Sequence, residues 1–223
     1  RLELGFGIAQ IEDRYFQNNV IDFDKDKYDK SGYRLFGGSV SFNGSTLNSR
    51  QFPIQGAREA LVAQIFTGNE SFRPGVNSEN KKPVKEKHSW LQLSYMKEKY
   101  HKMGANWILG WYLDAVYASK NFSENYTATM MQASEFAPTA HSKLTYNEAF
   151  RANQYVAAGI RPIYRLNQMF HVRGEFYGFL PIFPIERNSI NKAYYGKAFS
   201  RFEYLGEISV VCQLPFGAIS AYV

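Results

Sequence analysis

Cysteine is almost absent from this sequence, since Cys212 is the only one among 223 residues. A single thiol excludes an internal disulfide framework and a zinc site built from cysteines. Long apolar runs are absent as well, because no stretch approaches the roughly twenty apolar residues that a membrane-spanning helix needs. Charged residues contribute 21% and hydrophobic residues 45%, which excludes a disordered tail or a highly charged linker.

Aromatic residues are abundant, at 17% of the chain, and this enrichment favours β-strands. The dominant pattern is an alternation with a period of two, which predicts strands with one apolar and one polar face. In 170–180 the apolar face carries Phe170, Val172 and Phe176, and the opposite face carries Arg173 and Glu175. No segment has the periodicity of an amphipathic helix. Eight strands and the start of a ninth are expected, over 2–10, 33–47, 57–67, 89–99, 107–118, 154–165, 170–180, 202–214 and 219–223.

The connections between these expected strands alternate in length. The long ones are 11–32, 68–88, 119–153 and 182–200, and the short ones are 48–56, 100–106, 166–169 and 214–217. Most expected strands have about nine to thirteen residues, longer than is usual in soluble sheets and long enough to cross a bilayer at a tilt. Outer-membrane barrels have long external loops and short periplasmic turns. We therefore expect an all-β fold, an antiparallel transmembrane β-barrel of which residues 1–223 form a part.

A soluble β-sandwich has the same alternation of polar and apolar side chains and is the alternative from another class. It predicts two packed sheets with the aromatic face buried between them, and adhesion or carbohydrate binding as its function. The two ends bear on the same question, because both 1–8 and 219–223 have the pattern of strands. We expect the chain to be an internal piece of a longer protein, since open strand edges rarely end a self-contained domain.

The most specific string lies between the second and third expected strands, where Pro fixes φ and Gly permits positive φ, so a tight turn is predicted. It reads Asn48-Ser49-Arg50-Gln51-Phe52-Pro53-Ile54-Gln55-Gly56. Taken from Asn43, the segment resembles the N-T-x-(D/N)-x-x-x-(F/Y)-P-x-x-G periplasmic turn of the BamA/TamA-like barrels, the bacterial surface antigen superfamily. The resemblance implies that Asn48, Phe52, Pro53 and Gly56 form this periplasmic turn.

Further strings resemble one branch of that superfamily, the barrel that follows a patatin-like phospholipase domain in Gram-negative bacteria of the Bacteroides type. They are Phe-Thr-Gly-Asn-Glu at 66–70, 150–160, Tyr-Tyr-Gly-Lys-Ala-Phe-Ser at 194–200 and Leu-Pro-Phe-Gly at 214–217. The resemblance covers nearly the whole chain and implies roughly half of a sixteen-stranded barrel in the outer membrane. Its implied role is a non-catalytic anchor or translocator for an upstream patatin-like domain of the same chain. The barrel of an outer-membrane protein assembly factor is the alternative within this fold.

No catalytic residue, metal or cofactor is expected in this segment. A nucleophile elbow needs G-x-S-x-G at a strand–turn–helix junction, but the nearest string, at 37–41, ends in Ser41 and lies in an expected strand. The lipase residues implied for the parent therefore belong upstream of Arg1. The four histidines do not have the sequence spacing of a metal-binding motif: His88, His101, His141 and His171.

One structural site is predicted from the resemblance, because barrels of this superfamily fold a long external loop into the lumen. There an Arg of a V-R-G-F/Y motif meets an acidic residue. The matching loop is 119–153, and Arg151 of Phe-Arg-Ala is the candidate, with Phe for Val and Ala for Gly. Its expected partner is Glu175, so an Arg151–Glu175 ion pair would lock the loop. The string Val-Arg-Gly at 172–174 matches better in letters but lies within a strand, and we interpret it as coincidence.

The expected partner is the lipid of the outer membrane. Lys81, Lys82, Lys85 and Lys87 crowd one expected external loop, where contact with anionic lipopolysaccharide is one interpretation and a solvated loop the other. A nucleic-acid partner is not expected, despite a net charge of +6, because basic and aromatic residues do not interleave on one face.

Overall fold

The computed structural model describes residues 1–17, 27–76, 78 and 80–223. Nine strands form one antiparallel sheet in the order β1-β2-β3-β4-β5-β6-β7-β10-β11, so that each strand pairs with the next, and β8 and β9 form a separate hairpin within the β7–β10 connection. The all-β, antiparallel prediction is confirmed. The bounds are β1 Leu2–Tyr15, β2 Asp29–Ser45, β3 Gly56–Arg73, β4 Val84–Lys102, β5 Trp107–Ala118, β6 Gln154–Arg165, β7 Phe170–Pro181, β8 Ile185–Arg187, β9 Ala193–Tyr195, β10 Glu203–Leu214 and β11 Gly217–Tyr222.

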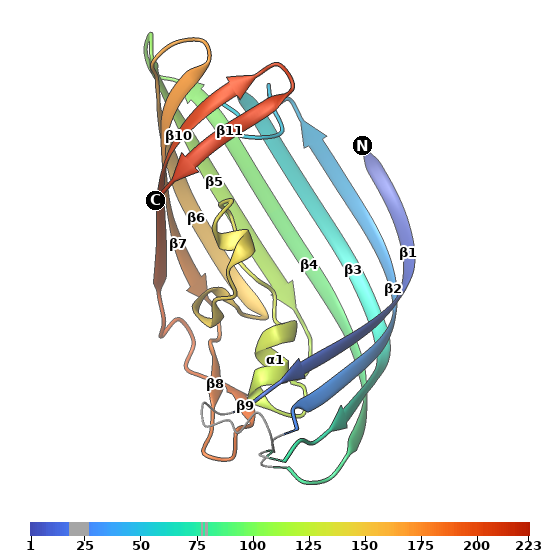
Figure 1. Cartoon of the computed structure of the whole chain (residues 1–223). Helices are drawn as coiled ribbons and strands as arrows, with labels where there is room; N and C mark the ends of the chain where they lie inside the picture. The colour runs from blue at the N-terminus through green and yellow to red at the C-terminus, as the bar shows by residue number, and fades with distance from the viewer. Residues whose placement is uncertain (18–26, 77, 79) are drawn as a thin grey trace.

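The sheet is a single curved layer with a concave and a convex side (Figure 1). The turns that join β2 to β3, β4 to β5, β6 to β7 and β10 to β11 lie at one end, and the other connections lie at the opposite end. In the described part of the chain β1 and β11 are edge strands that do not pair with each other, so the sheet is open rather than closed.

Strands β1 to β4 extend further than their apolar alternation predicts. The ladders continue to Tyr15–Asp29 between β1 and β2 and to Phe72–Val84 between β3 and β4, so much of the expected loops 11–32 and 68–88 is strand. These extensions carry charged side chains on the convex side, which hid the pattern, while Phe72 and His88 on the concave side are buried. The β3–β4 connection is thereby reduced to 74–83, no longer than the β2–β3 connection 46–55. Residues 18–26, within the expected loop 11–32, lie outside the described residues.

The long β5–β6 connection, 119–153, folds onto the concave side of the sheet and contains the helix that the sequence did not predict. Helix α1 (Tyr126–Gln132) begins where the Asn125 side chain accepts a hydrogen bond from the backbone N–H of Ala128, and two short 3-10 turns follow at Ser142–Leu144 and Glu148–Phe150. Seven residues are too few for an amphipathic pattern to emerge, so docking against the sheet stabilises this helix. Among the described residues, no helix is long and apolar enough to cross a membrane.

Candidate functional site

The convex side of the sheet is a continuous apolar surface. Its side chains come from alternate positions of every strand, and they are exposed although they are large and hydrophobic: Phe6 is 93% exposed, Ile65 64% and Tyr204 83%. No second sheet or helix of the described chain covers them (Figure 1). The surface also includes Leu4, Ile8, Phe36, Val40, Phe42, Leu61, Leu91, Leu93, Leu109, Tyr117, Val156, Ile160, Phe176, Ile208, Val210 and Ile219.

This apolar band has polar borders at both ends of the strands. On β3 the band lies between Glu59 and Asn69, ten residue steps apart, or about 33 Å along the strand at roughly 3.3 Å per residue. Glu59 accepts hydrogen bonds from Tyr95 at 2.6 Å and Lys97 at 3.4 Å, at the end of the short connections. The opposite border is made by charged residues of the strand extensions. A band of this height with no protein partner indicates that something other than water contacts it.

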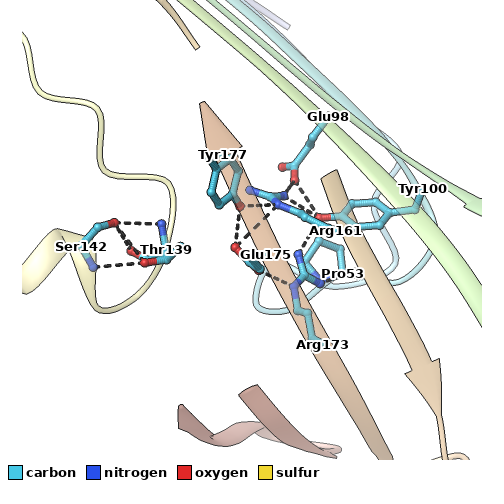
Figure 2. Close-up of polar contacts among 9 residues, drawn as sticks. All are labelled: Pro53, Glu98, Tyr100, Thr139, Ser142, Arg161, Arg173, Glu175 and Tyr177. Carbon is cyan, nitrogen blue, oxygen red and sulfur yellow. Dashed lines mark hydrogen bonds and ion pairs between the residues drawn. The ribbon is translucent and has the colours of Figure 1, made fainter. Parts of the chain in front are cut away.

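The concave side carries both aromatic and charged side chains, and it has a buried cluster of charges near the short-connection end (Figure 2). Arg161 of β6 pairs with Glu98 of β4, and Arg173 of β7 pairs with Glu175 of the same strand. The four residues are at most 7% exposed. Two guanidinium and two carboxylate groups balance, which a buried site requires because uncompensated charges are costly away from water.

Hydrogen bonds complete this charge cluster. The Arg161 Nε–H donates to the Tyr177 hydroxyl at 2.6 Å, and the Tyr177 hydroxyl donates to Glu175 at 2.5 Å. Tyr100 donates to Glu98 at 2.9 Å and accepts from Arg173 Nη2 at 2.9 Å. The network therefore ties β4, β6 and β7 together across the concave side (Figure 2).

The turn at Asn48–Gly56 has the tight geometry that its sequence predicts. The Asn48 side-chain oxygen accepts from the backbone N–H groups of Ile54 and Gln55, both at 3.0 Å, and Gly56 has φ of 93°. Phe52 also has a positive φ, of 49°. The Pro53 carbonyl accepts from Arg173 Nη1 at 2.9 Å, so the turn lies against the buried charge cluster on the concave side. The assignment of these residues to a periplasmic turn stays a prediction.

The predicted Arg151–Glu175 pair is wrong. Arg151 instead pairs with Glu135 at 2.7 Å, and its Nη1 donates to the backbone carbonyls of Met131 at 3.1 Å and Ala133 at 3.3 Å. The guanidinium therefore caps the carboxyl end of α1, where unpaired carbonyls favour a cation. Glu175 lies on the concave side as expected, but its partner is Arg173, the residue in the Val-Arg-Gly string that we interpreted as coincidence.

Aromatic packing, rather than that ion pair, holds the 119–153 connection in place. Phe136, 1% exposed, packs against the rings of Tyr155, Tyr177 and Phe179 at centroid distances of 6.0, 5.8 and 5.7 Å. These three rings lie on the concave faces of β6 and β7, which places the loop over the sheet. The alternation in 154–165 and 170–180 located these strand residues, but nothing in the sequence identified Phe136 as their partner.

A second polar cluster anchors the start of the same connection. His88 Nε2 lies 2.8 Å from a Glu70 oxygen, and the other Glu70 oxygen accepts from the backbone N–H of Glu124 at 3.3 Å. Nearby, the Lys120 ammonium lies 4.7 Å from the ring of Trp90. Burial lowers the pKa of Lys120 to about 8, although the negative charges of Glu70 and Asp13 act in the opposite direction.

Glu70, Glu86 and His88 bring one ligand atom each within 4.8 Å of one another, which the histidine spacing in the sequence did not predict. The Glu70 carboxylate already has protein partners on both oxygens. The hydrogen bonds of Glu70 to His88 and Glu124 therefore indicate that this cluster holds the 119–153 connection against the sheet. The string at 37–41 lies within β2, as expected, so Ser39 is on a strand and not on a nucleophile elbow.

Comparison with known proteins identifies no relative. No family model matches the chain, and no curated protein or solved structure is significantly similar to it.

Proposed function

We propose that this chain is part of an outer-membrane β-barrel whose convex side contacts lipid and whose concave side lines the lumen. The observation that carries the proposal is the exposed apolar band on the convex side, which no other part of the described chain covers. Lipid tails solvate such a surface without the penalty that water imposes, while a closed ladder of strands satisfies the backbone polar groups.

The dimensions of the band support this proposal. A strand tilt of roughly 35–45° shortens the 33 Å between its polar borders on β3 to about 25 Å, the height of the apolar belt of transmembrane barrels. Trp107 of β5 and Tyr164 of β6 lie next to short connections with ring centroids 4.9 Å apart. Aromatic pairs in this position are typical of the girdles at membrane interfaces.

Within this fold, the role we favour is the anchor or translocator segment of a patatin-like phospholipase, because the strings in 43–56, 66–70, 150–160, 194–200 and 214–217 resemble that branch. The lipase chemistry would then belong to a domain upstream in the same chain. Reading the gene upstream of Arg1 tests this directly. A signal peptide followed by G-x-S-x-G supports the phospholipase, whereas several periplasmic repeats would indicate an assembly factor.

Site-directed fluorescence in membranes tests the membrane contact itself. In a full-length protein with Cys212→Ala, a single cysteine is placed at Ile65 in the band and labelled with an environment-sensitive dye. We expect brominated lipids to quench the dye, because heavy atoms on the acyl chains would touch it. The matched control is a cysteine at Lys99, on the same convex face but beyond the band.

The soluble β-sandwich makes the opposite prediction. In that fold a second protein layer covers the band, so the protein should not be found in the membrane fraction. Brominated lipids should then not quench the dye at Ile65. Equal quenching at Ile65 and Lys99 would also contradict the proposal, because the polar border at Glu59 and Lys97 should lie outside the hydrocarbon.

A further inference from the structure

A basic hollow lies on the convex side just beyond the apolar band, at the end of the long connections. It has a volume of about 730 Å³ and is formed by the extensions of β1 to β4. Gly32 and Ser71 are cross-strand partners and form its floor. A Cβ at Gly32 would meet only the Ser71 carbonyl oxygen, at 3.8 Å, so the space above the floor is open.

Five cationic side chains surround this floor: Lys30 and Arg34 of β2, Arg73 of β3, and Lys85 and Lys87 of β4. Their alternation places them on the convex face, because Arg34 and Lys87 are both register partners of Asn69, and Lys85 is the partner of Ser71. Arg34 and Lys87 therefore flank Asn69 across two strand spacings, about 10 Å between backbones. Long basic side chains at this separation can converge on one anionic group.

The hollow has more positive than negative charge, because its lining contains the five cations and three carboxylates, those of Glu12, Glu70 and Glu86. Glu12 pairs with Lys30 at 2.5 Å and with Arg14 at 2.7 Å. Arg34, Arg73, Lys85 and Lys87 have no ion pair with any described residue. Lys30 and Arg73 are moreover direct register partners, and like charges directly opposite destabilise a sheet. A bound anion would relieve this repulsion.

An apolar groove of about 1040 Å³ continues from the hollow along the same convex face. Its walls are Phe6, Ile8, Phe36, Ile65 and Leu91, and Gly38 leaves space between them. The cross-strand row between hollow and groove consists of Ile8, Phe36, Thr67 and Ser89, and on β3 and β4 it holds only the small side chains of Thr67 and Ser89, which hydrogen-bond to each other at 2.9 Å. The side chains between the basic hollow and the apolar groove are therefore low over β3 and β4.

We infer that this face binds a phosphorylated glycolipid, with its phosphate groups in the hollow over Gly32 and Ser71 and an acyl chain in the groove over Gly38. The inference rests on the proposed function, because it needs the band to lie in a membrane. Four of these cations have no ion pair with a described residue, which exceeds the charge of one phosphodiester, and the hollow is larger than one phosphate group, so a multiply phosphorylated sugar headgroup fits better than a simple phospholipid. Basic side chains at a membrane surface favour such anionic headgroups.

Native mass spectrometry of the full-length protein in detergent tests this site, with diphosphoryl lipid A as the probe. Arg34→Gln combined with Lys87→Gln should weaken binding about 25-fold, since each basic residue near an anionic membrane surface contributes about fivefold. The matched control, Arg50→Gln with Lys99→Gln, removes the same charge from exposed positions at the other end of the sheet and should leave binding unchanged.

Two further measurements separate the headgroup from the chain. Gly38→Leu fills the groove, so it should weaken binding of lipid A but not of its deacylated, phosphorylated headgroup; Cβ contacts of 3.7 Å at Gly38 indicate that the strand tolerates a side chain. Lipid A without phosphates should bind weakly to the unmodified protein. Inorganic phosphate should not compete, because one small anion cannot contact the several cations of the hollow at once.

Unchanged lipid A binding in the Arg34→Gln/Lys87→Gln variant, or an equal loss in the control variant, would overturn the inference. So would displacement by inorganic phosphate, which would make the hollow a site for free anions. Each variant is first checked for folding and for quenching of the dye at Ile65. If the quenching persists while the lipid A result fails, only the glycolipid site is refuted; if the quenching is absent in the unmodified protein, the membrane proposal itself fails.

Discussion

The buried charge cluster on the concave side gives the sharpest prediction about stability. In Arg173→Met the guanidinium is replaced by an apolar side chain of similar length at a position that is 2% exposed. Three partners lose a donor: the Glu175 carboxylate, the Pro53 carbonyl and the Tyr100 hydroxyl. The variant therefore tests whether this network is dry and whether it holds the 46–55 turn against the sheet.

Two estimates of the cost compete. Removing one partner of a buried ion pair costs about 3–5 kcal/mol because the remaining charge is uncompensated. Glu175 keeps the Tyr177 hydroxyl and lies 3.7 Å from Arg161, so the lower part of that range is expected, and the unpaired Pro53 carbonyl adds about 1–3 kcal/mol. If water filled the concave side, the same pair would contribute only about 0–1 kcal/mol. We expect a loss of about 4 kcal/mol.

The assay is equilibrium unfolding by guanidinium chloride of the full-length protein in detergent, followed by tryptophan fluorescence. A double-mutant cycle with Glu175→Gln isolates the pair, because Arg173→Met and Glu175→Gln each leave the other charge without its nearest counter-ion, whereas the double variant removes both charges. We expect the double variant to lose clearly less than the sum of the single losses. A single-variant loss under about 1 kcal/mol, or simple additivity, would refute the dry network.

Three other predictions follow from single contacts. Phe136→Ala should cost about 3–5 kcal/mol and speed cleavage by trypsin after the exposed Lys143 in limited proteolysis, because the loop is no longer held against the sheet. Leu144→Ala, at a position 79% exposed, should change neither stability nor cleavage. Burial lowers the pKa of Lys120 from 10.5 to about 8, so the folded state binds this proton less tightly than the unfolded chain. The free energy of unfolding should therefore rise as pH increases from about 8 to about 10.5. Lys120→Met should abolish this rise, measured as the midpoint of denaturation at each pH. Gly56→Ala should destabilise the protein by about 1–3 kcal/mol, because φ is 93° and the new Cβ would lie 2.1 Å from the Thr46 carbonyl oxygen. The control is Gly104→Ala, where a new Cβ would have no atom within 4 Å. Equal losses of stability in thermal melting of the two variants would contradict the strain argument.

The sequence alone determined the central part of each of the nine strands of the main sheet and the face that its side chains occupy, but not the extensions of β1 to β4 or the β8–β9 hairpin. Alternation in 154–165, 170–180 and 202–214 assigned Arg161, Glu175 and Glu207 to one side and Ile160, Phe176 and Ile208 to the other, and the structure buries the first set and exposes the second. This works because side-chain direction in a strand has a fixed period of two, whatever the neighbouring strands are.

Only the tertiary structure decided which polar groups meet. Arg151 and Glu175 share the concave side, but the docking of Phe136 leaves Arg151 at the end of α1. Independently, the 46–55 turn contacts Arg173 through the Pro53 carbonyl. The basic hollow has the same origin, since Arg34, Ser71 and Lys87 become neighbours through the register of three strands. Pairings over such separations depend on register and loop packing, which a local pattern does not encode.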